Sequence, residues 1–184
     1  QRAVPVGEGA MAAMLGLSLE DAVATAEEAA QGEVCAAAND NATGQVVISG
    51  SSAAIDRAVE IAKEKGAKKA MRLTVSAPFH CALMKPAAEV MAEALSHVDI
   101  NEPKVPVVAN VLATSATNPA MIRSLLVEQV TGSVRWRESV AWMAEQGVSE
   151  IYEIGAGKAL SGMVRRIDRS IACTAVGTPD DVKA

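Results

Sequence analysis

The first part of the chain alternates between runs typical of strands and runs typical of helices. The run GAMAAMLGL at 9–17 is almost entirely apolar and predicts a strand. Ser18 and Asp21 follow it with the spacing of a helix-capping box, so a helix is expected to begin at SLED. Two further strands are predicted by VCAAAND and QVVISG, and the NATG between them is typical of a hairpin turn.

A second helix and a fourth strand complete this unit. After GSS at 50–52, apolar residues recur at the i, i+3, i+4, i+7 spacing of one helix face, namely Ile55, Ala58, Val59 and Ala62. The run AKKAMRLTV at 67–75 then predicts a closing strand. The resulting order βαββαβ is that of a ferredoxin-like fold, in which two helices cover one face of a sheet. We therefore expect a small ferredoxin-like subdomain over residues 1–75.

After Val75 the pattern changes to helices between buried strands. One helix is expected from about Ala82, with an apolar stripe formed by Met84, Ala87, Ala88, Met91 and Leu95. VPVVANV at 105–111, EIYEIG at 150–155 and IACTAVG at 171–177 are predicted to be strands separated by further helices. Such alternation favours a parallel sheet in an α/β fold. Three strands make a thin sheet, so residues 76–184 are predicted to be part of a larger domain.

The composition argues against several classes of function. Half of the 184 residues are hydrophobic but only 2% are aromatic, so the stacking platforms of single-stranded nucleic acid binders are missing. The formal net charge of −5 gives no sign of a surface for polyanions. No apolar stretch approaches the roughly 20 residues of a membrane span, and the N-terminus lacks the layout of a signal peptide. We therefore expect neither nucleic acid nor a membrane as a partner.

The three cysteines, Cys35, Cys81 and Cys173, are odd in number and lack CxxC spacing. This usage is typical of reduced thiols in a cytoplasmic protein rather than of a disulfide framework. The chain has two histidines, His80 and His97, and no carboxylate or cysteine has metal-ligand spacing to either. No metal site is therefore expected.

His80 is the first candidate catalytic residue. In SAPFHCALM at 76–84 it lies between a predicted strand and a predicted helix, the position at which open α/β sheets bind ligands. A neutral imidazole there can take a proton from a hydroxyl and return it to a leaving group, provided that a partner fixes its tautomer. The alternative is a histidine that only caps the helix. A catalytic pair with Cys81 is disfavoured, because adjacent side chains point in different directions.

Two segments resemble known catalytic loops but fail on spacing. GAGKALSG at 155–162 has Leu160 where the dinucleotide motif needs glycine, so only a tight strand-to-helix turn with exposed backbone N–H groups is predicted. GLSLE at 16–20 ends in Glu20 rather than in the glycine of a nucleophile elbow, and Ser18 is better placed as a helix cap. No serine of this chain is therefore predicted to be a nucleophile.

Three amide side chains are candidates for a polar pocket. Gln129 continues the apolar helix stripe of Ile122 and Leu125, so it is expected to face inward and to need hydrogen-bond partners. A frayed helix end exposed to water fits the same pattern. Asn39 and Asn41 lie on the same side of a strand that leads into a hairpin, where they would line a pocket. Residues of this type also commonly form turns.

Five segments together resemble one enzyme family. They are VPVGEGAMAAMLGL, NDNATGQVVISG, SAPFHCALMKPAAE, VPVVANV and YEIGAGKALSGMVRRI. In this order they resemble the malonyl-CoA:acyl carrier protein transacylases of bacterial fatty acid biosynthesis, over essentially the whole chain. In that family a ferredoxin-like subdomain is inserted into a hydrolase-like α/β domain with a parallel sheet. The resemblance thus implies that residues 1–75 are the small subdomain and residues 76–184 the C-terminal portion of the large one.

The resemblance also implies a chemistry. The family transfers a malonyl group from malonyl-CoA to the phosphopantetheine thiol of acyl carrier protein through an acyl-serine. His80 is similar in position to the catalytic histidine, Gln129 to the residue whose main-chain carbonyl orients it, and Asn39 and Asn41 to pocket-facing, substrate-binding asparagines. The nucleophilic serine and the arginine that binds the malonyl carboxylate belong to the N-terminal part of the family's sequence, which this chain lacks. Coenzyme A thioester is a substrate, and no cofactor is implied.

Two classes of function remain open at this stage. The first is a part of the transacylase, inactive alone and dependent on the missing N-terminal part of the same protein, in the cytoplasm. The second is a non-catalytic ferredoxin-like binding module. A related polyketide-type acyltransferase is a further alternative, because Phe79 before His80 resembles the malonyl-type members of that group.

Overall fold

The elements predicted for the first part of the chain are present in the computed structural model, which describes residues 4–5 and 7–182. They are β1 (Gly9–Leu15), α1 (Leu19–Ala30), β2 (Cys35–Ala42), β3 (Gln45–Ser51), α2 (Ser52–Glu64) and β4 (Lys69–Arg72). The order βαββαβ is confirmed, although β4 is shorter than the predicted 67–75. The Ser18 side chain accepts a hydrogen bond from the N–H of Asp21, as the capping spacing predicts.

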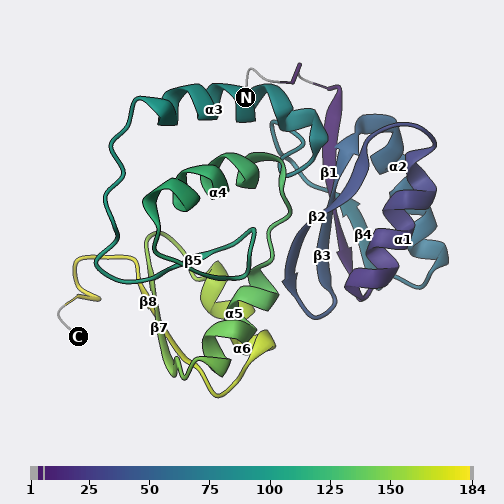
Figure 1. Ribbon diagram of the computed structural model, residues 1–184. Coiled ribbons are helices and arrows are strands. Elements are labelled where there is room, and N and C mark those ends of the chain that lie inside the picture. The colour runs from purple at the N-terminus through teal and green to yellow at the C-terminus, as the bar shows by residue number, and fades with distance from the viewer. Residues whose placement is uncertain (1–3, 6, 183–184) are drawn as a thin grey trace.

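The four strands form one antiparallel sheet in the order β2-β3-β1-β4. Helices α1 and α2 lie together on one face of it (Figure 1). The core between helices and sheet consists largely of alanine, and its buried members are Ala10, Ala12, Met14, Leu17, Ala26, Ala29, Ile48, Ile55, Ala58 and Ala62. Because alanine carries only a methyl group, the helix backbones lie close to the sheet, and the few larger side chains fill the remaining volume.

The other face of the sheet packs against the segment that precedes His80. The apolar cluster on that face contains Met11, Ala38, Val47, Leu73 and Phe79. Gly9 permits the close approach of this segment to β1, because a Cβ at that position would lie 2.2 Å from the ring of Pro78. The sheet is therefore apolar on both faces, and its second face holds the residues next to the candidate histidine.

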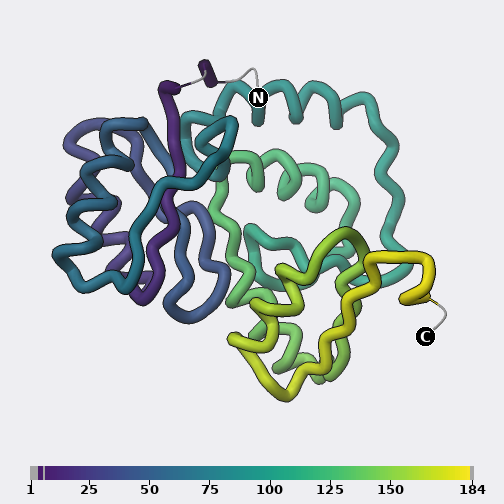
Figure 2. The backbone as a smooth tube through the Cα atoms, turned by 180° about the vertical axis from the view of Figure 1, so that it is seen from behind, coloured from purple at the N-terminus to yellow at the C-terminus, as the bar shows by residue number. Residues whose placement is uncertain are grey.

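The remaining elements follow after residue 75. They are the short helix η1 (Ala82–Met84), α3 (Lys85–Ser96), β5 (Val107–Ala109), β6 (Thr114–Ala116), α4 (Pro119–Thr131), α5 (Trp136–Glu145), β7 (Glu150–Ile154), α6 (Ala159–Ile167) and β8 (Ala172–Val176). Helices α3 and α4 lie side by side in both views (Figures 1 and 2). Strands β7 and β8 are parallel, and α6 connects them. Val140, Val164 and Ile171 form the buried cluster that joins α5 and α6 to this pair.

The prediction that the strands after Val75 form a single parallel sheet is wrong for the described residues. Strand β5 pairs antiparallel with β6, which the hydrophobic pattern does not indicate, and only β7 and β8 are parallel. The cause is a turn at 110–113, closed by a hydrogen bond of 2.8 Å from the Ala113 N–H to the Ala109 carbonyl, which sends the chain back along β5. The broader prediction of a mixed α/β fold is confirmed.

The apolar stripe predicted for the helix from Ala82 is only partly buried, because Ala87, Ala88 and Leu95 are half-buried and Met91 is 40% exposed. Met84 is buried in η1, but no residue of α3 is buried, and Val90 is 70% exposed. On β7, Ile154 is 81% exposed. Within the described ranges, no helix has both the length and the apolar character needed to cross a membrane.

An ion pair between Asp40 on β2 and Arg137 on α5 joins the sheet to the later elements. The Asp40 side chain is 3% exposed, and Nε and Nη2 of Arg137 lie 2.8 to 3.1 Å from its oxygens. The hydrogen bonds to Asp40 raise the pKa of the Arg137 guanidinium above its ordinary value. Next to the pair, the main chain of Val134 exchanges hydrogen bonds of 2.8 Å with Ala38 and Asp40. The two parts of the chain therefore meet through a bidentate charged contact with defined geometry.

Arg137→Met is expected to lower the free energy of unfolding by roughly 2–4 kcal/mol, because it leaves the buried Asp40 carboxylate without its cation. The matched control is Arg72→Met, which removes a pair to Asp56 whose side chains are 46% and 57% exposed. That loss is expected to stay below about 1 kcal/mol. Urea denaturation followed by circular dichroism measures both values. Equal losses in the two variants would show that the buried pair is no more important than an exposed one.

Candidate active site

His80 lies in a turn between β4 and η1, and its backbone φ is 59°. The sequence pattern predicts that it directly follows a strand and opens a helix. Instead β4 ends at Arg72, and the N-cap residue of η1 is Cys81, so His80 belongs to the irregular segment between them. A left-handed backbone is unfavourable for a residue with a Cβ atom, and such residues cluster at functional sites.

The neighbours of His80 hold this turn in place. Phe79 packs into two apolar clusters, one on the second face of the sheet and one around Met84. Pro78 and Cys81 are buried, and Cys81 Sγ donates a hydrogen bond of 3.2 Å to the carbonyl of Pro78. The thiol is thus used inside the turn, in keeping with the expectation that it does not pair with the imidazole. The position of His80 is set by packing on both sides.

The ring of His80 meets the main chain of α4. Its Nδ1 lies 3.0 Å from the carbonyl oxygen of Gln129. A carbonyl oxygen can only accept, so Nδ1 carries a proton, and in the neutral imidazole Nε2 then carries the lone pair. No described residue bonds Nε2 of His80. The bond therefore selects one tautomer and directs the basic nitrogen away from α4.

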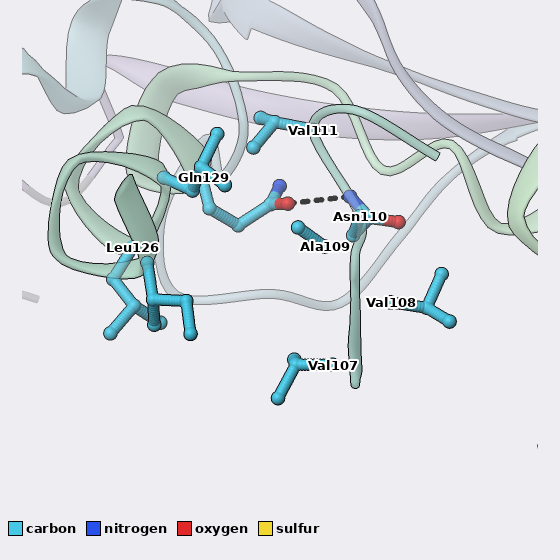
Figure 3. Close-up of a pocket in the computed structure, with 9 residues that line it drawn as sticks. Val107, Val108, Ala109, Asn110, Val111, Leu126 and Gln129 are labelled. Carbon is cyan, nitrogen blue, oxygen red and sulfur yellow. Dashed lines mark hydrogen bonds between the residues drawn. The ribbon is translucent and has the colours of Figure 1, made fainter. Parts of the chain in front are cut away.

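The side chain of Gln129 is hydrogen-bonded at both ends. Its Nε2 donates to the carbonyl of Gly132 at 3.0 Å, and its Oε1 accepts from Nδ2 of Asn110 at 2.5 Å (Figure 3). The same Nδ2 donates to the carbonyl of Ser133 at 3.2 Å. Gln129 is thus a partly buried amide with a hydrogen bond at each end, as the helix stripe predicts, and not a frayed end in water.

An apolar cavity of about 180 Å³ lies between β5 and α4. Its lining consists of Val107, Val108, Ala109, Val111, Ile122, Leu125 and Leu126 together with the two amide residues Asn110 and Gln129 (Figure 3). Oδ1 of Asn110 is buried and has no hydrogen-bond partner among the described residues. Leaving a polar atom in this state costs about 1–3 kcal/mol.

The two asparagines of β2 are not brought into contact with this network. Asn39 and Asn41 are half-buried, and both lie within β2 rather than in the turn that follows it. Among the described residues, neither side chain makes a hydrogen bond to His80 or Gln129. Between them, the side chain of Asp40 is buried and bonds Arg137. The structure therefore leaves both amide groups open for other partners, without assigning them one.

The first turn of α6, which follows the glycine turn after β7, is capped by a carboxylate from the chain itself. The Glu153 carboxylate, 9% exposed, accepts from the N–H groups of Leu160 and Ser161 at 3.0 and 2.7 Å and from the Ser161 hydroxyl at 2.5 Å. These hydrogen bonds, that of the hydroxyl first, lower the pKa of Glu153. The predicted strand-to-helix turn is present and residues 155–158 are exposed, whereas the N–H groups at the start of α6 are taken by Glu153.

The other candidate nucleophiles and ligands are used structurally. Burial raises the pKa of the Cys35 thiol to about 11, which disfavours the reactive thiolate. Ser18 Oγ caps α1 and bonds the Asp21 carboxylate, so it is unavailable as an elbow serine. Throughout residues 4–5 and 7–182, no group of three or more His, Cys, Asp or Glu side chains could hold a metal ion.

Asn110 and Glu153 are the residues that the sequence patterns miss. Asn110 is a polar residue at the end of the apolar run VPVVANV, and Glu153 is a charged residue within EIYEIG. A polar side chain within an otherwise apolar, strand-like run is the signal that marks both positions, although it does not show what either side chain bonds.

A model of the acyl transferase domain family matches residues 2–178. The chain belongs to this family. Within it, the chain is 46% identical over 184 residues to the malonyl CoA-acyl carrier protein transacylase of Escherichia coli (strain K12) and 44% identical over 182 residues to that of Bacillus subtilis (strain 168). These matches cover 100% and 98% of this acyl transferase chain, but 60% and 57% of the relatives. The resemblance seen in the sequence is confirmed.

Solved structures give the same result. An acyl carrier protein S-malonyltransferase from Vibrio cholerae superimposes with a TM-score of 0.96 at 44% identity, covering 100% of this acyl transferase chain and 60% of the other. A malonyl-transacylase solved in complex with a type II PKS acyl-carrier protein superimposes with a TM-score of 0.96 at 42% identity, covering 100% and 59%. The chain thus spans about 60% of the length of the transacylases that it matches.

Glu153→Gln is expected to destabilise the acyl transferase chain at neutral pH, because an amide cannot accept all three hydrogen bonds of the carboxylate. Since the pKa of Glu153 is lowered on folding, its contribution is complete above the ordinary glutamate pKa of about 4.3 and is lost as the pH falls through the lowered value. The difference in Tm between wild type and variant should therefore shrink in acid. Glu150→Gln on the same strand, at an exposed carboxylate, is the control. A pH-independent difference would contradict the assignment.

Proposed function

We propose that this chain is the C-terminal part of a malonyl-CoA:acyl carrier protein transacylase and that His80 is its catalytic base. The observation that carries the proposal is the hydrogen bond from His80 Nδ1 to the main-chain carbonyl of Gln129. It leaves Nε2 with a lone pair, as a base acting on a hydroxyl requires. Similarity to transacylases along the whole chain supports the same chemistry.

The proposed reaction has two balanced halves. A serine from the remaining part of the protein attacks the thioester carbonyl of malonyl-CoA, while Nε2 of His80 takes the hydroxyl proton. The C–S bond breaks, and the proton passes to the departing sulfur of coenzyme A. Next, Nε2 takes the thiol proton of the phosphopantetheine arm, whose sulfur attacks the acyl-serine. The ester C–O bond breaks, and the proton passes to the serine oxygen. The coenzyme A thioester is a substrate, and the scheme uses no cofactor.

Orientation of His80 by a carbonyl group suits this reaction. A neutral acceptor fixes the tautomer but stabilises the imidazolium less than an aspartate does. A thiolate leaving group needs little protonation, so the weaker stabilisation is sufficient. The role of Gln129 is therefore carried by its main chain.

The two parts of the chain are proposed to be subdomains of that enzyme. We infer a ferredoxin-like small subdomain over residues 1–75, which is supported by the βαββαβ order and by a core that lies wholly within it. Residues 76–184 would be the C-terminal portion of a hydrolase-like α/β large subdomain. Asn39 and Asn41, half-buried on β2, are proposed to bind substrate through amide groups that bond no other described side chain.

Acyl carrier protein is the proposed acceptor. Arg165, Arg166 and Arg169 line an open hollow beside β8, a cationic surface that suits the phosphate groups of coenzyme A and phosphopantetheine. A carrier protein of polyketide synthesis is the second candidate, favoured by the solved complex of a relative with such a carrier. Both carriers undergo the same reaction, and free thiols in the described residues fit a cytoplasmic enzyme.

His80→Ala in the complete protein is expected to lower the rate of malonyl transfer by at least roughly 10³, because the serine loses its base. His97→Ala, at an exposed histidine on the end of α3, is the matched control and should leave the rate unchanged. Steady-state kinetics with either carrier protein measures both. A loss below about tenfold in His80→Ala would return His80 to a structural role.

Acyl-enzyme formation distinguishes this chain from the complete enzyme. With labelled malonyl-CoA, residues 1–184 alone should form no stable acyl-enzyme, because the proposed nucleophile lies in the other part. Stable ester label on a serine of this chain would overturn the proposal.

Residues 1–75 expressed alone are expected to give a dispersed amide NMR spectrum, because the core between the sheet and α1 and α2 lies within them, even though the second face of the sheet loses its contact with Phe79. Residues 76–184 should not, because apolar side chains such as Val90 and Ile154 are exposed there. The opposite result would show that the proposed subdomain boundary is misplaced.

A further inference from the structure

We propose that Asn110 is a positioning residue for His80. Its side chain acts through Gln129, whose side chain it bonds and whose carbonyl accepts from the imidazole. The effect of Asn110 on catalysis rests on the proposed function. The effect of Asn110 on the tautomer of His80 does not, so the two effects can be tested separately.

The helix end that carries this carbonyl has no regular continuation. Helix α4 ends at Thr131, the Gly132 N–H bonds back to the Glu128 carbonyl at 2.8 Å, and Gly132 itself is extended at φ −79° and ψ 148°. The carbonyl of Gln129 is thus one of the last four of the helix, which lack N–H partners in a following turn. Its direction depends on how residues 129–133 are held beyond the helix.

Asn110 holds that segment at two points. One Nδ2 group donates to Gln129 Oε1 at 2.5 Å and to the Ser133 carbonyl at 3.2 Å. Gln129 Nε2 then closes the loop onto the Gly132 carbonyl at 3.0 Å. The end of α4 is thereby tied to the residue directly after β5. Figure 3 shows the two amide groups pointing toward each other in the lining of the cavity.

The chemistry of the network requires a hydrogen-bond donor at position 110. The Gly132 carbonyl can only accept, so Gln129 presents Nε2 to it and turns Oε1 toward Asn110, which must then present Nδ2. The remaining atom, Asn110 Oδ1, is buried with no described partner. The residue therefore contributes here through its donor group alone. Because the other residues that line the cavity are apolar, none of them can supply a replacement donor when that of Asn110 is lost.

The test is the tautomer of His80, measured by long-range ¹H–¹⁵N correlation spectra of the complete protein labelled with ¹⁵N-histidine. At mildly alkaline pH, where imidazole is neutral, the wild type should show a protonated Nδ1 and an unprotonated Nε2 at His80. A His80→Gln variant identifies these signals, and the exposed His97 serves as the internal reference.

Two variants remove the donor in different ways. Asn110→Ala deletes the side chain, whereas Asn110→Asp keeps its shape and replaces the donor by an acceptor. In both, the population of His80 is expected to shift measurably toward the Nε2-protonated form. The matched control is Asn118→Ala, which removes the N-cap bond to Met121 at the opposite end of the same helix and should leave the His80 signals unchanged.

Each outcome decides the proposal. Unchanged His80 signals in the two Asn110 variants, or equal changes in Asn118→Ala, would overturn it. Unfolding of both Asn110 variants while Asn118→Ala stays folded, seen by circular dichroism, would also overturn it, because Asn110 would then support the fold as a whole. If the tautomer shifts and the complete protein shows no malonyl transfer, the positioning role stands and the proposed function fails.

In an active transacylase the same variants give a second readout. Asn110→Ala is expected to lower kcat roughly three- to tenfold with little change in KM, because it disturbs the base and not the substrate contacts. Gln129→Ala keeps the carbonyl and loses the same side-chain network, so it should also cost less than about tenfold. The double variant should be no worse than either single one, since both remove one network. Additive losses would contradict the link between Asn110 and Gln129.

Discussion

The main-chain carbonyl of Gln129 is free to accept from His80 only because α4 stops at Thr131. Inside a longer helix the same oxygen would accept from the N–H four residues later and would be closed to an imidazole. The residues around Gly132 favour this end of the helix. A Cβ at Gly132 would lie 2.8 Å from the Val111 side chain and 3.0 Å from the Glu128 carbonyl, so a larger residue here would require these neighbours to shift.

The other half of the contact depends on the sheet. The turn that carries His80 is held by Phe79 on the second face of the sheet, while α4 packs against η1 and α3. Between these parts, the buried carboxylate of Asp40 bonds Arg137, which is 97 positions away in the chain. The imidazole and its acceptor therefore come from separate layers, and the distance between them reflects how firmly those layers are joined.

The first part of the fold could be predicted from the sequence because its signals are local. The cap at Ser18, the helix stripe of α2 and the NATG turn each lie within a few residues. Strand β6 and the reversal after β5 depend on a turn that contains a left-handed Ala113, for which alanine gives no signal. Likewise, the Glu153 side chain on β7 accepts hydrogen bonds from N–H groups in the first turn of α6. The sequence alone does not show that these N–H groups have a partner.

In the candidate site, too, some features have a local sequence signal and others do not. His80 has a local signal, and the helix stripe indicates that Gln129 faces inward, but their pairing comes from the family resemblance and is seen directly only in the structure. Asn110 gives no signal of its role, because its partners Gln129 and Ser133 lie beyond a reversal of the chain.

The alanine-rich interior under α1 and α2 affects how the βαββαβ part of the chain responds to substitutions. Alanine has no side-chain rotamers to lose, so ordering these positions costs almost no side-chain entropy. For the same reason, the fully buried Ala12, Ala58 and Ala62 cannot rotate to fill a gap or to make room. A larger side chain at any of them must be accommodated by its neighbours, through movement of a helix backbone or a rotamer change in Met14, Ile48 or Ile55. The interior therefore costs little side-chain entropy to order, but few of its positions can repack.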